Sequence, residues 1–200
     1  LRPFVEADLD RATINDWDTI QYEALSTRSG MQYALPRSLG ALALYYNRDM
    51  FDEHGVDYPD GHWTYDDYLG AMKRLTGERD ADGRQDRWGS MMDITWERIQ
   101  VHVNGWGGHF VDPQNPKRCL MVEPEAMAAL RWLRARIWED HCMASFLDVQ
   151  NLSVSQAFVQ ERLAMVEDGS WALKNILEGA RFRVGVAPFP AGPARKVTLA

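Results

Sequence analysis

The stretch that most constrains the fold is an apolar run, Leu163–Val166, followed by two acids, a glycine, a serine and a tryptophan. Consecutive apolar residues bounded by polar ones are typical of a short buried strand. Gly169 tolerates backbone angles that other residues avoid, so it predicts a sharp corner after this strand. Ser170 is a favourable N-cap, which predicts a helix opening at Trp171 with its first N–H groups forming an outward polar cradle.

Trp171 has two interpretations at this corner. It can plug the core, as an average tryptophan does, or it can present its indole face to a ligand at the mouth of the helix. Its position alone does not separate the two.

The remaining chain alternates strand-like and helix-like segments, which indicates an α/β fold. Residues 1–30 suggest small surface helices, and the Pro- and Gly-rich stretch 188–193 resembles a linker. The other expected strands cover residues 31–35, 39–46 and 88–92. The expected helices cover residues 48–54, 65–75, 95–105, 124–140 and 154–161.

Composition narrows the classes of function. The 200 residues are 46% hydrophobic and 11% aromatic, which indicates a globular chain with a sizeable core. The net charge of −7, with no basic stripe, argues against nucleic acid as a partner. No apolar run approaches the ~20 residues that a membrane-spanning helix needs.

The two cysteines, Cys119 and Cys142, are expected to be free thiols. The expected helix 124–140 lies between them and would be about 25 Å long at about 1.5 Å per residue. The Cα atoms of two disulfide-bonded cysteines lie only about 5.5 Å apart. The few residues between each cysteine and the helix cannot easily double back over that distance.

Candidate metal ligands are few. Asp80, Asp82 and Asp86 surround a glycine, as in a calcium loop, but the run lacks the length and the closing glutamate of an EF-hand. A solvated turn is the better interpretation, with calcium as the alternative. His102 and His109 are separated by glycines that break a shared helical face, so no metal site is expected.

Signals for catalysis are also lacking. The adjacent acids, such as Glu167 and Asp168, should point to opposite faces of a strand and make no acid–base pair. The sequence carries no nucleophile elbow, P-loop or dinucleotide fingerprint. We therefore expect no catalytic residues and no cofactor.

Several motifs together resemble a known family. Gly169-Ser170-Trp171 followed by Val184–Pro190 resembles the extracellular solute-binding proteins of bacterial ABC sugar importers, the family that includes maltodextrin-binding protein. The resemblance extends upstream through Tyr33–Pro36, Leu44–Phe51 and Trp63–Tyr68, in the order and spacing of the family.

This resemblance implies a periplasmic-binding-protein-like type II fold with two α/β lobes and a sugar held between them. Residues 1–37 would be the tail of the N-terminal lobe and the first crossover. Residues 38–196 would form the C-terminal lobe, and 197–200 would start the second crossover. The chain would thus cover mainly the C-terminal lobe.

The implied function is an extracytoplasmic receptor that binds a carbohydrate and delivers it to the permease of an ABC importer. The protein would be periplasmic or a membrane-anchored lipoprotein, and a monomer when full-length. The missing signal peptide would then mean that the sequence is mature or trimmed. The alternative is a fragment of a larger α/β enzyme that acts on glycans.

The resemblance also implies ligand-binding residues. Trp171 matches the stacking tryptophan of the family, with the backbone of Gly169 and Ser170 beside it. Arg37 and Ser38 match the crossover that borders the cleft, although Arg37 could equally be an exposed hinge charge. Trp96 and Glu97 match the start of a helix that lines the cleft. For Trp96, a core stripe shared with Ile99, Val103 and Trp106 is the alternative.

Overall fold

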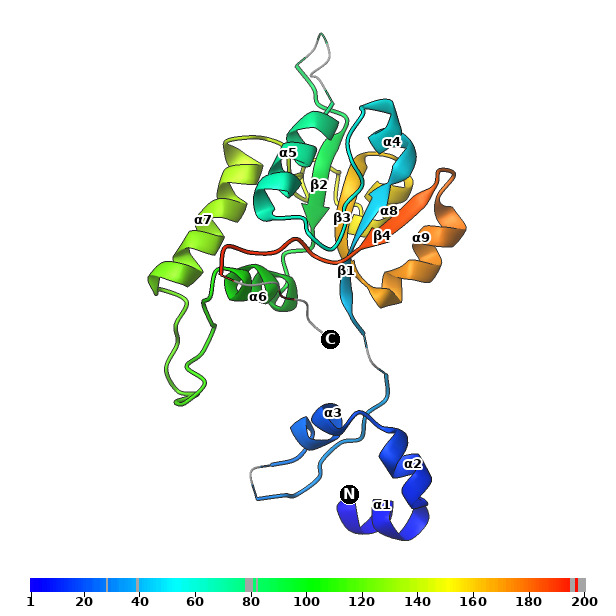
Figure 1. Ribbon diagram of the computed structural model, residues 1–200, viewed down its shortest axis with the longest axis vertical. Coiled ribbons are helices and arrows are strands. Elements are labelled where there is room, and N and C mark those ends of the chain that lie inside the picture. Colours follow the sequence, from blue (N-terminus) through cyan, green and yellow to red (C-terminus); the bar gives the residue numbers. More distant parts are fainter. Residues whose placement is uncertain (28, 39, 78–80, 82, 195–196, 198–200) are drawn as a thin grey trace. The chain divides into compact units, whose positions relative to one another are not determined.

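The computed structural model describes residues 1–27, 29–38, 40–77, 81, 83–194 and 197. The chain divides into two compact units, Leu1–Leu39 and Gly40–Ala200 (Figure 1). Each unit is described by itself.

The first unit contains the small helices α1 (Arg2–Asp8), α2 (Arg11–Asp16) and α3 (Thr19–Ala24), as expected. The predicted strand 31–35 is wrong, because only an isolated bridge between Ser26 and Gln32 is formed in the described part of this unit. The buried Gln32 instead organises the loop, since its side-chain amide donates to two backbone carbonyls at 3.0 and 2.7 Å.

The second unit is built on a four-stranded sheet. Its strands are β1 (Leu42–Asn47), β2 (Trp88–Met92), β3 (Leu163–Gly169) and β4 (Val184–Ala187), in the order β2-β3-β1-β4. β2 runs parallel to β3, and β1 is antiparallel to both β3 and β4. The carboxyl ends of β2, β3 and β4 therefore share one edge with the amino end of β1, and we call this the carboxyl edge.

All seven residues of β3 are buried. β3 is longer than predicted, because Glu167 and Asp168 continue the strand rather than end it. Buried acids are tolerated only where partners compensate them, and those partners are described with the site below.

Helices cover both faces of the sheet. On one face, α4 (Arg48–Glu53), α5 (Tyr65–Leu75) and α7 (Pro124–Trp138) share one core with alternate residues of β1. On the other face lie α8 (Val154–Val159) and α9 (Leu173–Gly179). The remaining helix, α6 (Trp96–Gly105), lies below the arrowhead of β2 at the carboxyl edge (Figure 1).

The helix starts follow local capping chemistry, which confirms the expected first residues of α4, α5 and α8. Asn47 Oδ1 accepts from two backbone N–H groups at the start of α4. Thr64 and Asp67 form a capping box for α5, and Ser153 and Gln156 form another for α8. α7 and α8 each end two residues earlier than expected.

The predicted linker at 188–193 is wrong. Phe189 and Pro190 are buried, and the N–H of Ala191 donates to the carbonyl of Trp63 at 2.7 Å. Turn-forming composition marked an irregular segment correctly, but that segment packs on the second unit.

Cys119 is exposed and Cys142 is buried, and both are free thiols, as predicted. In the described ranges, no helix is long and apolar enough to cross a membrane.

Candidate ligand-binding site

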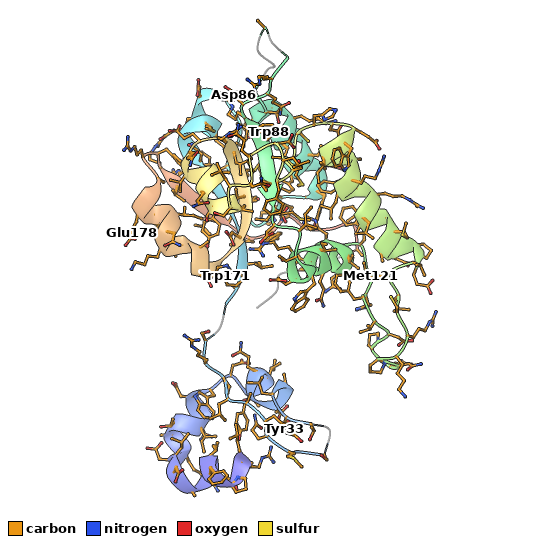
Figure 2. All side chains as sticks on the ribbon, turned by 180° about the vertical axis from the view of Figure 1, so that it is seen from behind. Tyr33, Asp86, Trp88, Met121, Trp171 and Glu178 are labelled. Atoms are coloured by element: carbon orange, nitrogen blue, oxygen red, sulfur yellow. The ribbon has the colours of Figure 1, made fainter. Side chains whose placement is uncertain are left out.

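Trp171 lies at the carboxyl edge, in the 3₁₀ turn η1 (Ser170–Ala172) that joins β3 to α9 (Figure 2). Its side chain is 57% exposed, so it does not plug the core. An aromatic ring that leaves this much of itself in water at the end of a buried strand is available to a ligand.

The Trp171 ring packs directly against the main chain at Gly40 and Gly169, and we call these two residues the glycine bed. A Cβ atom on Gly169 would stand 2.2 Å from Cζ2 of Trp171, and one on Gly40 would stand 2.9 Å from Cζ3. Carbon atoms need about 3.5 Å or more between them. The Trp171 ring therefore lies closer to the main chain at both positions than a residue with a Cβ atom would allow.

The predicted reasons for Gly169 and Ser170 are wrong. Gly169 has φ −88° and ψ 165°, an extended conformation open to any residue, so it serves close approach and not an unusual corner. Ser170 is not an N-cap, since its Oγ accepts from the N–H of Ala41 at 3.3 Å.

The N–H groups of Gly169 and Ser170 are not available to a ligand beside Trp171, whereas the outward cradle of first-turn N–H groups stays a prediction. The N–H of Ser170 donates to the carbonyl of Ala41 at 2.8 Å, and the N–H of Gly169 donates to Oδ1 of Asp168 at 2.7 Å. Both N–H groups are satisfied within the chain. Gly169 and Ser170 support the tryptophan rather than offer donors beside it.

Trp96 and Glu97 occupy the first turn of α6, at the same edge. Trp96 is 64% exposed, so the core stripe fails at this position, although Val103 farther along the helix is buried. Glu97 Oε2 is shielded from solvent and has no hydrogen-bond partner among the described residues. The start of α6 thus supplies an exposed ring and a partly exposed carboxylate.

Arg98 joins the two halves of the site, and sequence reasoning missed it. Its guanidinium carbon lies 5.8 Å from the centroid of the Trp171 ring. Nη2 donates to Asp168 at 2.6 Å, Nε donates to the carbonyl of Glu167 at 3.3 Å, and Nη1 donates to Thr95 at 3.0 Å. Arg98 therefore places the start of α6 beside the indole.

More than one carboxylate surrounds the single positive charge of Arg98. Asp93, which follows β2, and Glu97 each place a carboxylate oxygen 3.8 Å from Nη1. Asp168 is the buried partner of the guanidinium, with only 8% of its side chain exposed. Asp93 and Glu97 are partly exposed and can accept hydrogen bonds from a ligand.

A buried polar network underlies this surface. His102 Nε2 lies 2.7 Å from Glu167 Oε2, and His102 Nδ1 lies 2.7 Å from the hydroxyl of Tyr65. The hydroxyl of Tyr68 donates to Glu167 Oε1 at 3.0 Å and also contacts Ser90. This network compensates the buried Glu167 carboxylate and lets β3 continue past Val166.

The network also assigns its protons. Burial, with a smaller contribution from the Glu167 charge, raises the pKa of Tyr65 and of Tyr68 well above the usual value, so both keep their protons. Tyr65 can then donate to Nδ1 of His102, which leaves Nε2–H to donate to Glu167. With both ring nitrogens engaged, His102 is not available to a metal.

In the ranges that the structure describes, no group of three or more His, Cys, Asp or Glu side chains could hold a metal ion. Asp80 and Asp82 of the calcium alternative lie outside the described residues.

Arg37 and Ser38 belong to the first unit, where both are exposed. Their part in ligand binding stays a prediction. Within the second unit, the structure brings Gly169, Ser170 and Trp171 together with the first turn of α6 through Arg98.

A comparison with known families matches residues 3–199 to the family described as bacterial extracellular solute-binding protein. A Brucella abortus (strain 2308) protein that bears the name of a binding protein is 25% identical over 174 residues, which cover 84% of this chain and 40% of that protein. The chain thus spans less than half the length of this curated relative.

Solved structures agree. The ABC substrate-binding protein Lmo0181 of Listeria monocytogenes, in complex with cycloalternan, is 27% identical with a TM-score of 0.85, and the match covers 99% of this chain and 48% of that one. UspC of M. tuberculosis is 26% identical with a TM-score of 0.72, over 98% of this chain and 54% of that one.

These likenesses confirm the periplasmic-binding-protein-like α/β fold and give no support to the enzyme alternative. Since the family match covers nearly the whole chain, the chain belongs to the bacterial extracellular solute-binding proteins.

Proposed function

We propose that the full-length protein is the substrate-binding component of an ABC importer, which captures a carbohydrate outside the cytoplasm and hands it to the permease. The observation that carries this proposal is the exposed indole of Trp171, laid on a glycine bed at the carboxyl edge. Sugars present apolar C–H faces that stack on such rings, and ligands of open α/β sheets bind at the carboxyl ends of the strands.

The polar part of the site supports a saccharide ligand as well. The side chains of Asp93 and Glu97 are 37% and 27% exposed, and each places a carboxylate oxygen 3.8 Å from Nη1 of Arg98. Sugar hydroxyl groups are donors that such carboxylates bind through charge-assisted hydrogen bonds. A ring for the apolar face and acceptors for the hydroxyl groups together fit a carbohydrate.

The relatives favour an oligosaccharide. The Listeria protein was solved with cycloalternan, and a T. maritima protein of the same fold, MalE3, was solved with maltose. UgpB from Mycobacterium tuberculosis has the same fold and was solved in complex with glycerophosphocholine, so this compound is the non-sugar ligand to compare with the saccharides.

Binding would close two lobes around the ligand, with contacts from both lobes stabilising the closed state. In this assignment residues 1–37 are the tail of the N-terminal lobe and the first crossover, 38–196 form the C-terminal lobe, and 197–200 begin the second crossover. Arg37 and Ser38 would border the cleft. The receptor would be a monomer, periplasmic or held at the membrane as a lipoprotein.

The proposal is tested on the full-length protein by calorimetry with maltotriose, mannobiose, cycloalternan and glycerophosphocholine. Trp171→Ala should weaken binding of the preferred saccharide by about 1–3 kcal/mol, the usual worth of an aromatic anchor. Trp138→Ala is the matched control, because Trp138 is 59% exposed on α7.

Equal affinity in wild type and Trp171→Ala would remove Trp171 from the site. Release of a cleaved product from any saccharide would favour the enzyme alternative. Cell fractionation that places the protein in the cytosol would refute the receptor.

A further inference from the structure

Two consecutive acids at the end of β3 are held by two basic side chains of α6. Asp168 accepts from Arg98 at 2.6 Å, and Glu167 pairs with His102 at 2.7 Å. The arrangement joins two adjacent residues of a strand to two residues one turn apart on a helix.

The spacing gives this double contact its geometric effect. Arg98 and His102 are four residues apart, so they lie on the same side of α6 and about 6 Å apart along its axis. One contact would leave the helix free to rotate about it or slide. Two contacts at different heights set both the rotation and the height of α6 against β3.

The contacts are almost completely removed from water. The side chains of Arg98 and Asp168 are 5% and 8% exposed, and those of His102 and Glu167 are 0% exposed. Well-packed apolar residues often stabilise a fold as well as a buried ion pair does. What these two polar contacts add is a defined geometry, since only one register of α6 satisfies both.

The residues proposed to bind the ligand lie on α6 or directly after β3, the two elements that this contact joins. Trp171 lies three residues after Asp168, and Trp96 and Glu97 immediately precede Arg98. Arg98 also packs its guanidinium over the indole. The position of the ring relative to the first turn of α6 therefore depends on the same side chains.

We propose that Arg98 and His102 are positioning residues, which lock α6 to β3 so that Trp171 and the first turn of α6 meet a ligand at a fixed spacing. The proposal rests on the proposed function for its ligand. Its effect on the indole exists without any ligand and can be measured separately.

The test uses full-length protein labelled with 5-fluorotryptophan, in which Trp171→Phe assigns the Trp171 resonance. Arg98→Lys keeps the charge but loses the forked donors and the stacking. This variant should shift and broaden the Trp171 resonance without ligand, and should weaken binding of maltotriose, or of the saccharide preferred in calorimetry, about tenfold.

The matched control is Asp140→Asn, which weakens the partly buried pairs of Asp140 with Lys73 and Arg136 at the far end of α7. It should lower the melting temperature while leaving the Trp171 resonance and the affinity unchanged. If Arg98→Lys fails to fold, Asp168→Asn is used. The asparagine keeps an acceptor oxygen for the N–H of Gly169, while it removes the charge and replaces the other oxygen by a donor NH2 group.

An unchanged Trp171 resonance in a folded Arg98→Lys or Asp168→Asn protein overturns the positioning role. So does a change of the same size in Asp140→Asn, because the effect would then be a general loss of stability. A shifted resonance in a protein that binds none of the saccharides upholds the positioning role and refutes the proposed function.

Discussion

Replacing Gly169 by alanine tests whether the seat of the indole matters for binding. The new Cβ atom would stand 2.2 Å from Cζ2 of Trp171 and 2.3 Å from Cε2 and Cη2. Because ordinary carbon contacts begin at about 3.5 Å, the ring must lift by about 1 Å or more. The backbone accepts alanine here, since its φ of −88° is ordinary. The substitution therefore moves the ring without forcing the strand to change.

The expected effect is a loss of part of the stacking energy, about 1 kcal/mol, or roughly fivefold in affinity. The loss should be smaller than in Trp171→Ala, which removes the whole ring. Calorimetry with the preferred saccharide measures it, and urea unfolding measures stability in the same samples.

Gly70→Ala is the control for a glycine replacement. Gly70 lies in α5, and a Cβ atom there would meet nothing within 4 Å. It should leave affinity unchanged and raise stability by about 0.5–1 kcal/mol. If Gly169→Ala binds the saccharide with wild-type affinity, the idea that the glycine bed fixes the Trp171 ring in its binding position is refuted.

Two further predictions concern stability and reactivity. At pH 8, a thiol reagent should label Cys119 at once and Cys142 only after unfolding, because burial and the nearby Asp140 charge raise the pKa of Cys142 to about 11; two fast thiols would contradict this. Thr64→Ala should cost about 1 kcal/mol at pH 7 by urea unfolding. Hydrogen bonds from Thr64 lower the pKa of Asp67. The stability that these bonds contribute is therefore present above the unfolded carboxyl pKa of about 4 and is lost as pH falls through the lower pKa of the folded state. An equal cost of Thr64→Ala at pH 2 and at pH 7 would refute this coupling.

Local chemistry made much of the second unit predictable. Asn47, Thr64 and Ser153 cap the helices that follow them, and these starts depend on neighbours a few residues away. The failed strand at 31–35 shows the limit of such signals. A strand needs a partner, and no local pattern tells whether another segment will pair with it.

The position of Trp171 after β3 was predicted correctly, but for partly wrong reasons, and its part in ligand binding stays a prediction. Trp171 is exposed as a binding residue should be, but Gly169 serves close packing and Ser170 serves an earlier loop. Arg98 could not be found from its surroundings in the sequence, because its partners lie some 70 residues later. One signal was available in the two acids that directly extend an apolar run, since buried acids require basic partners.

The strand order also dictates when the sheet can be completed. β1 pairs with β3 and β4, which lie well over 100 residues later in the chain, and β3 is also the parallel partner of β2. During synthesis the apolar β1 therefore has neither neighbour until β3 emerges. Contacts so distant in sequence are slow to form. Docking of β3 between β1 and β2 should limit the folding rate, and until it occurs the sheet of the second unit lacks the strand that joins β1 to β2.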